Sequence, residues 1–134
     1  MVQSEMCANW GYNNLHMAIR KQAMEEMHHA EWLIERIIFF DGLPDPPGLS
    51  TLKIGKSVAD MINNVISEEL NAVSAYNNAI NLAREVNDHG SVELLAMILK
   101  MEEKHVDWIE AQQIQMKQMG VENYLATQLN CPLN

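Results

Sequence analysis

The sequence predicts an all-α protein, and its composition and the spacing of its apolar residues carry that prediction. Apolar residues make up 48% of the chain and aromatic residues only 6%. Ala, Leu, Ile, Met, Glu and Gln are abundant, which favours helix over strand. Three long stretches place apolar residues at steps of three or four, the spacing of one helical face. At 134 residues we expect a single domain over 1–134.

The first long helix is predicted over about residues 14–40, a stretch without Pro or Gly. Its stripe consists of Leu15, Ile19, Gln22, Glu26, His29, Leu33 and Ile37. Gly42 and Pro44 end it, since Gly suits the turn after a helix and Pro cannot continue one. The residues up to Trp10 and Gly11 are expected to be the end of an earlier helix.

A loop is predicted over residues 41–56, which contain three of the four prolines. A hairpin between antiparallel helices needs only a few residues. About fifteen residues can instead cross the length of a helical bundle and join two parallel helices. We therefore expect a long crossover here.

Two further helices follow the loop. The second has Ser57 as its N-cap and the stripe Val58, Ile62, Val65, Glu69, Ala72, Tyr76, Ile80 and Ala83. The third has the stripe Leu95, Ile98, Glu102, His105, Ile109, Gln112 and Met116. The turn formers at 87–90 separate them by a short connection, which makes them antiparallel neighbours. The third helix ends at Gly120, and residues 121–129 are expected to form two short turns.

These stripes contain five residues of the kinds that bind metal ions: Glu26 and His29 on the first, Glu69 on the second, Glu102 and His105 on the third. Residues three apart project from one helical face, so each Glu-x-x-His step can reach one metal site. A carboxylate can bridge two metals while the imidazole binds one. Buried carboxylates cost several kcal/mol unless something compensates them, and divalent cations do so directly. The sequence predicts a two-metal site inside a helical bundle.

Other interpretations of these residues stay open. Glu-x-x-His arises readily by chance, and Glu25/His28 is a third match that we expect at the surface. The five residues can also be core side chains that only form hydrogen bonds with each other. If they bind metals, mixed carboxylate and imidazole ligands suit iron or manganese, and the absence of thiolates argues against structural zinc. Oxygen chemistry is then the leading expectation, with two-metal hydrolysis as an alternative.

The formal charge of −9 and the absence of a basic stripe argue against a nucleic-acid partner. Such a charge attracts small cations, although it can also serve solubility alone. No apolar stretch approaches membrane-spanning length, and the first residues lack a signal-peptide pattern. Cys7 and Cys131 have no framework spacing, which indicates a reducing compartment. We expect a cytoplasmic protein without a membrane partner.

Several separate segments resemble the bacterioferritins, in order along the chain. They are residues 24–31, 34–37, 42–44, 52–55, 69–70, 102–108 and 119–125. The resemblance implies a ferritin-like four-helix bundle with a long crossover and a short C-terminal helix, here three full helices plus the end of a truncated first one. It implies self-association into dimers and a cage, usually of 24 subunits. It further implies a ferroxidase that oxidises ferrous iron with oxygen or peroxide, for iron storage and detoxification as ferric mineral.

The resemblance also implies roles for the five candidate ligands. Glu26 and Glu102 would bridge two irons. His29 and His105 would each bind one iron, and Glu69 would be the terminal carboxylate on the second iron. These five residues match five of the six ligands of the family's di-iron site.

The family also binds haem b between two subunits, with one methionine from each, and Met27 matches that position. Met27 is rotated about 100° from Glu26 around the helix, so it faces a neighbour when Glu26 faces the core. Met27 can instead serve only to pack against other side chains, since the chain has ten methionines.

The sequence departs from the family pattern at its N-terminal end. Residues 3–10 resemble the last turns of the first helix, and Glu5 would lie on the order of 20 Å from the position of the sixth ligand. Three explanations compete: Met1 is internal to a longer reading frame, a neighbouring subunit covers the open groove, or a degenerate subunit works beside a complete partner subunit. A non-catalytic haem-binding or structural subunit is therefore the alternative function. A plain helical interaction module is a third class, and the lack of a basic tail disfavours a DNA-protecting mini-ferritin.

Overall fold

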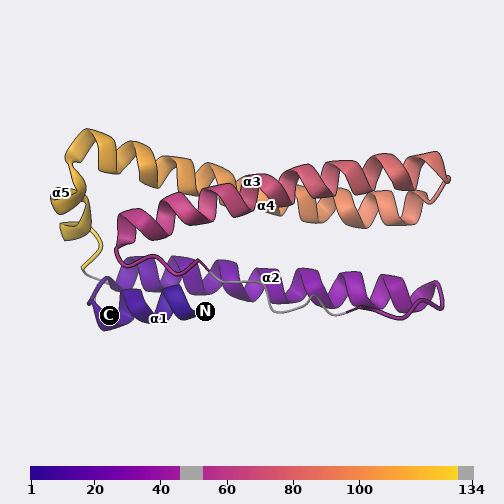
Figure 1. Cartoon of the computed structure of the whole chain (residues 1–134), viewed down its shortest axis with the longest axis horizontal. Coiled ribbons are helices and arrows are strands. Elements are labelled where there is room, and N and C mark those ends of the chain that lie inside the picture. The colour runs from indigo at the N-terminus through magenta and orange to yellow at the C-terminus, as the bar shows by residue number, and fades with distance from the viewer. Residues whose placement is uncertain (46–52, 130–134) are drawn as a thin grey trace, which may run out of the picture. The chain divides into compact units, whose positions relative to one another are not determined.

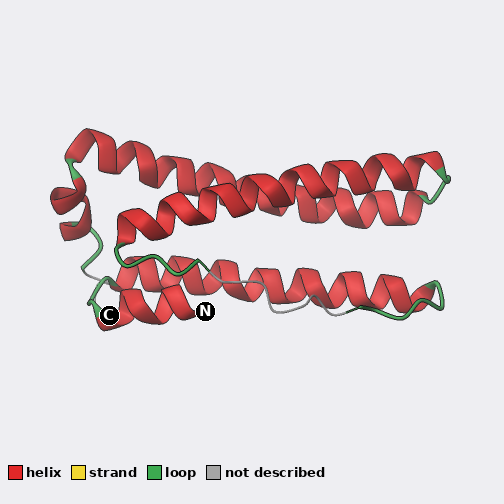
Figure 2. Ribbon diagram, viewed as in Figure 1, coloured by secondary structure: helices red, strands yellow, loops and turns green. Residues whose placement is uncertain are grey.

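The computed structural model describes residues 1–45 and 53–129, and every regular element in this part of the chain is a helix (Figures 1 and 2). The five helices are α1 (Val2–Asn9), α2 (Asn13–Phe39), α3 (Val58–Glu85), α4 (His89–Met119) and α5 (Val121–Ala126). The predicted all-α class is confirmed. The helices belong to two compact units, Met1–Ile54 with Thr127–Asn134 and Gly55–Ala126, and each is described by itself.

In the first unit, α1 and α2 form a short helical hairpin (Figure 1). Gly11 in the turn has φ +83°, the left-handed region that favours glycine. Across the hairpin, His16 Nδ1 lies 2.9 Å from the carbonyl oxygen of Ser4 and 3.2 Å from the side-chain Oγ of Ser4. The predicted earlier helix is confirmed as α1, and α2 begins and ends within one residue of its expected bounds.

Residues from near the C-terminus form hydrogen bonds with the first turn of α2. The backbone N–H of Asn14 donates to the carbonyl oxygen of Gln128 at 3.2 Å, and Asn14 Nδ2 donates to that of Thr127 at 3.2 Å. These bonds satisfy an amide in the first turn of the helix, where no intrahelical partner exists. Nearby in the same unit, burial raises the pKa of the Cys7 thiol, while Cys131 lies outside the described residues.

In the second unit, α3 and α4 form a long antiparallel hairpin, as predicted (Figure 1). Ser57 is the N-cap of α3, because its Oγ accepts the backbone N–H of Asp60 at 3.2 Å. Asn87 has φ +59° in the turn between the helices, a conformation that Asn tolerates better than most residues. The Ser57 cap and the turn at Asn87 fix where α3 starts and where it stops.

The predicted turn at 87–90 is wrong in its second half. Asp88 accepts the backbone N–H of Ser91 at 3.2 Å through Oδ1, which makes Asp88 the N-cap of α4. His89 and Gly90 therefore lie in the first turn of the helix. Glycine has low helix propensity, but a capping carboxylate compensates for it in a first turn.

α5 folds against the end of α4. Gly120, with φ +77°, ends α4, and Tyr124 on α5 is fully buried. The Tyr124 hydroxyl donates to Gln112 Oε1 at 2.6 Å. Of the segment 121–129, where two short turns are predicted, residues 121–126 are helical and residues 127 and 128 form a turn that is not helical. The buried apolar core of the unit consists of Val58, Met61, Ile62, Ile80, Ala83, Ile98, Ile109, Met116 and Tyr124.

The predicted crossover is described only at its two ends. Residues 41–45 and 53–56 are not helical, whereas 46–52 lie outside the described residues, so the crossover itself stays a prediction. At its far end Gly55 is required, because a Cβ there would lie 2.5 Å from the backbone nitrogen of Met61. None of the described helices combines the length and apolar character needed to cross a bilayer.

Tyr124→Phe should lower the free energy of unfolding by about 1–2 kcal/mol, because it leaves the buried Gln112 carbonyl without its donor. Urea denaturation followed by circular dichroism measures the change. Tyr12→Phe, at a half-buried tyrosine of the other unit, is the control and should change stability less. Equal effects of the two substitutions would contradict a specific role for this bond.

Candidate metal centre

α4 carries a buried Glu-x-x-His step on the face that it turns toward the core. Glu102 Oε2 lies 3.6 Å from His105 Nδ1, and the two side chains are 1% and 5% exposed. Ile98 and Ile109, one turn to either side on the same stripe, are fully buried. The spacing that identified these residues therefore places them inside an apolar helix face.

α3 supplies a third side chain to the same place. Glu69 is 14% exposed, and its Oε2 lies 3.9 Å from His105 Nδ1. One ligand atom from each of Glu69, Glu102 and His105 lies within 4.8 Å of the others. The antiparallel hairpin thus brings together residues from two helices that the sequence only placed on separate stripes.

The separations in this trio suit a shared cation better than direct hydrogen bonds. Distances of 3.6 and 3.9 Å to His105 Nδ1 exceed the 2.7–3.2 Å that is typical of N–H···O bonds. Two atoms that each bind one cation at about 2.2 Å are at most about 4.4 Å apart. Both distances to His105 fall below that limit, so each carboxylate can share a divalent cation with this imidazole.

The charges of Glu69, Glu102 and His105 also favour a bound divalent cation. Two carboxylates and one imidazole lie in an apolar surrounding, where an uncompensated ion costs several kcal/mol. Protonation of His105 would offset only one of the two negative charges. A divalent cation offsets both, and oxygen and nitrogen donors without thiolate favour iron or manganese.

α2, in the first unit, carries the other Glu-x-x-His step, Glu26 and His29. Glu26 Oε2 lies 3.6 Å from His29 Nδ1, the separation found for Glu102 and His105. The His29 side chain is 2% exposed and that of Glu26 is 44% exposed. The indole of Trp32 contacts the imidazole of His29, with ring centroids 5.7 Å apart. α2 therefore presents a second, partly open ligand pair.

The overlapping match Glu25/His28 is a surface feature, as expected. His28 is exposed, and its Nδ1 lies 3.5 Å from Glu31 Oε2. Glu25 Oε1 lies 3.9 Å from Lys21 Nζ. Each of the two therefore has an ion-pair partner on the surface of α2, and neither points to a buried site.

Met27 lies on α2 next to Glu26 in sequence and is 52% exposed. An exposed methionine is available to a ligand or to a second protein surface. The predicted haem contact at this residue remains a prediction.

The structure thus brings together Glu69, Glu102 and His105 in one unit, and Glu26 with His29 in the other. Outside these five, no three metal-binding side chains cluster within residues 1–45 and 53–129. Sequence reasoning missed the contact of Trp32 with His29. A signal for it was present, because each histidine of the two steps is followed by tryptophan three residues later, Trp32 and Trp108.

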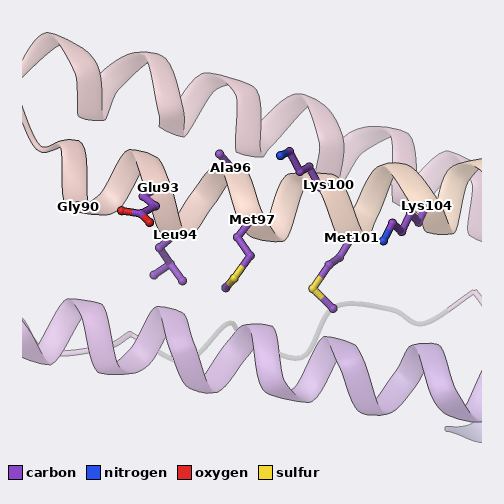
Figure 3. Close-up of a pocket in the computed structure, with 8 residues that line it drawn as sticks. All are labelled: Gly90, Glu93, Leu94, Ala96, Met97, Lys100, Met101 and Lys104. Carbon is purple, nitrogen blue, oxygen red and sulfur yellow. The ribbon is translucent and has the colours of Figure 1, made fainter.

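α4 also lines a pocket on another face (Figure 3). Leu94, Met97 and Met101 point to one side of the helix there, and Lys100 and Lys104 flank them. None of the five candidate ligands lines this pocket. The lining also includes Glu93, a single carboxylate among apolar and basic side chains, so this pocket lacks the cluster of metal-binding side chains found around Glu102.

Comparison with known proteins shows the family to which this chain belongs. The family model of the ferritin-like domain matches residues 1–119. The chain is 35% identical to bacterioferritin from Brucella melitensis over 116 residues, 87% of this chain and 72% of that protein. It is 34% identical to bacterioferritin from Mycobacterium avium over 131 residues, which cover 98% and 82% of the two chains. A bacterial ferritin from Synechocystis is 31% identical over 130 residues, 96% of this chain and 83% of that protein.

The chain therefore belongs to the ferritin-like family. Within that family its relatives are bacterioferritins, which confirms the resemblance found in the sequence.

Glu102→Gln should leave the metal-free protein as stable as the wild type or more stable, because it removes a buried negative charge beside Glu69 without changing the shape of the side chain. Thermal unfolding in the presence of a chelator measures this. Glu103→Gln, at the exposed neighbour on α4, should have little effect. A clear loss of stability in Glu102→Gln would show that the carboxylate serves the fold rather than a metal.

Proposed function

We propose that this protein stores and detoxifies iron by oxidising ferrous ions at a carboxylate-bridged two-iron site and keeping the ferric product inside a cage of its own copies. The buried trio Glu69, Glu102 and His105 is the observation that carries the proposal, because its charge and spacing call for a divalent cation. The relatives named bacterioferritin support iron as that cation.

In this proposal all five candidate ligands bind the substrate iron. Glu26 and Glu102 bridge the two ions, while His29 and His105 each bind one. Glu69 completes the position beside His105. Each ferrous ion gives up one electron, and the pair of electrons reduces dioxygen to hydrogen peroxide, or hydrogen peroxide to two water molecules, with two protons taken up from solvent. The side chains hold both ions, offset most of their positive charge and exclude water on the His105 side.

The surface of the chain supports uptake of iron and self-association. The formal charge of −9 raises the local concentration of cations. Along α2, large apolar side chains are exposed: Met17, Met24, Met27, Ile34, Ile37, Ile38 and Phe39. Extended exposed apolar surface is typical of protein interfaces. We propose dimers and a larger homo-oligomeric cage, usually of 24 copies in this family, in the cytoplasm.

Glu102→Ala and His105→Ala should each abolish the oxygen- or peroxide-dependent loss of ferrous iron above the uncatalysed rate, because each removes a buried ligand. A colorimetric ferrous chelator follows the reaction. Glu103→Ala and His28→Ala change the exposed neighbours of the same residue types and should retain the activity. Oxidation that continues unchanged in Glu102→Ala and His105→Ala would refute the proposal.

The second candidate is a non-catalytic haem-binding or structural subunit of a ferritin-like cage. The exposure of Met27 on α2 favours it. Iron content after anaerobic loading separates the two candidates. Two irons per chain support the ferroxidase, whereas one or none together with bound haem supports the alternative.

If haem b binds through Met27, Met27→Leu should remove its visible absorption bands, since leucine keeps the apolar volume but offers no sulfur ligand. Met24→Leu, at an exposed methionine one turn earlier on α2, should leave the bands in place. Haem bound equally by both variants would exclude Met27 as the axial ligand.

A further inference from the structure

His29 cannot be fixed as a ligand by its backbone alone. The ring torsion of histidine is broad, so a helical backbone leaves several ring orientations open. In the structure Nδ1 of His29 is directed toward Glu26 at 3.6 Å, although Glu26 is too far away to form a direct hydrogen bond with it. The contacts that the imidazole makes with its neighbours therefore decide which orientation it takes.

Trp32 makes that contact from one turn further along α2. Its ring centroid lies 5.7 Å from that of His29, with the planes tilted by 39°. This lies within the 4.5–7 Å range of favourable aromatic pairs. Glu26 precedes His29 by three residues and Trp32 follows it by three. The imidazole therefore has the carboxylate of Glu26 and the indole of Trp32 as neighbours.

The same indole also lies beside the neighbouring histidine. The ring centroids of Trp32 and His28 are 6.2 Å apart, with the planes tilted by 22°. His28 is 55% exposed and pairs with Glu31, whereas His29 is buried. Trp32 therefore contacts both members of an adjacent histidine pair, of which only one belongs to a buried ligand step.

We infer that Trp32 is a positioning residue, which holds the His29 imidazole in the orientation that binds the metal. The inference rests on the proposed function, because it assumes that His29 is a ligand. It assigns to Trp32 no contact with iron and no part in electron transfer. Residues that orient metal-binding histidines typically change metal affinity by about 10- to 100-fold when they are lost.

The test uses Co²⁺ as a stand-in for ferrous ion, because its visible absorption reports the number and kind of its ligands. The wild-type protein should bind two Co²⁺ per chain. Trp32→Ala should weaken one of the two by about tenfold or more. Trp32→Phe should restore most of that affinity, since the phenyl ring still contacts the imidazole. Trp10→Ala, a half-buried tryptophan of the same unit, is the control and should bind both ions as the wild type does.

A spectroscopic signature separates positioning from general stability. In a variant with Trp10→Phe and Trp108→Phe, Trp32 is the only tryptophan, and its fluorescence should fall as Co²⁺ occupies the position beside His29. Adding His29→Ala should remove that quenching while the protein stays folded by circular dichroism.

The inference is overturned if Trp32→Ala binds both ions with wild-type affinity. It is also overturned if Trp32→Phe or Trp10→Ala weakens binding as much as Trp32→Ala does. These outcomes leave the proposed function standing, because the wild-type protein still binds two ions. A wild-type protein that binds fewer than two Co²⁺ ions contradicts both.

Discussion

The buried carboxylate of Glu102 sets the main constraint on this structure. It lies in the centre of α4, on a face whose other buried residues include Ile98, Ile109 and Met116, with Glu69 and His105 beside it. A helix hairpin that served only to fold would place apolar residues there, because such replacements are often neutral or stabilising. In the proposed function a divalent cation occupies this place, where it compensates two carboxylates at once and accepts a neutral imidazole as a further ligand.

The rest of the second unit keeps these three side chains in register. The Ser57 cap fixes the start of α3, and the Asn87 turn with the Asp88 cap fixes the start of α4. A shift of either helix by one residue would rotate its stripe by about 100° and move Glu69 away from His105. At the other end, the bond from Tyr124 to Gln112 ties α5 to the same face of α4. Local capping thus determines the geometry of a site several turns away.

Much of the fold and part of the candidate site could be predicted from the sequence. The stripes identified the helices, because a core-facing helix must repeat its apolar residues every three or four positions. They also placed Glu102 and His105 correctly in the interior. The start of α4 was missed because an aspartate cap outweighs the turn preference of His89 and Gly90. The Trp32–His29 contact was missed because a stripe defines a helix face and leaves the orientations of its rings open.

Whether both Glu-x-x-His steps bind metal can be measured by the anomalous scattering of iron in crystals that are loaded with ferrous ion without oxygen. We expect two peaks per chain, one beside Glu102 and His105 and one beside Glu26 and His29. Iron found only at surface carboxylates or at His28, with none beside His105, would contradict this expectation.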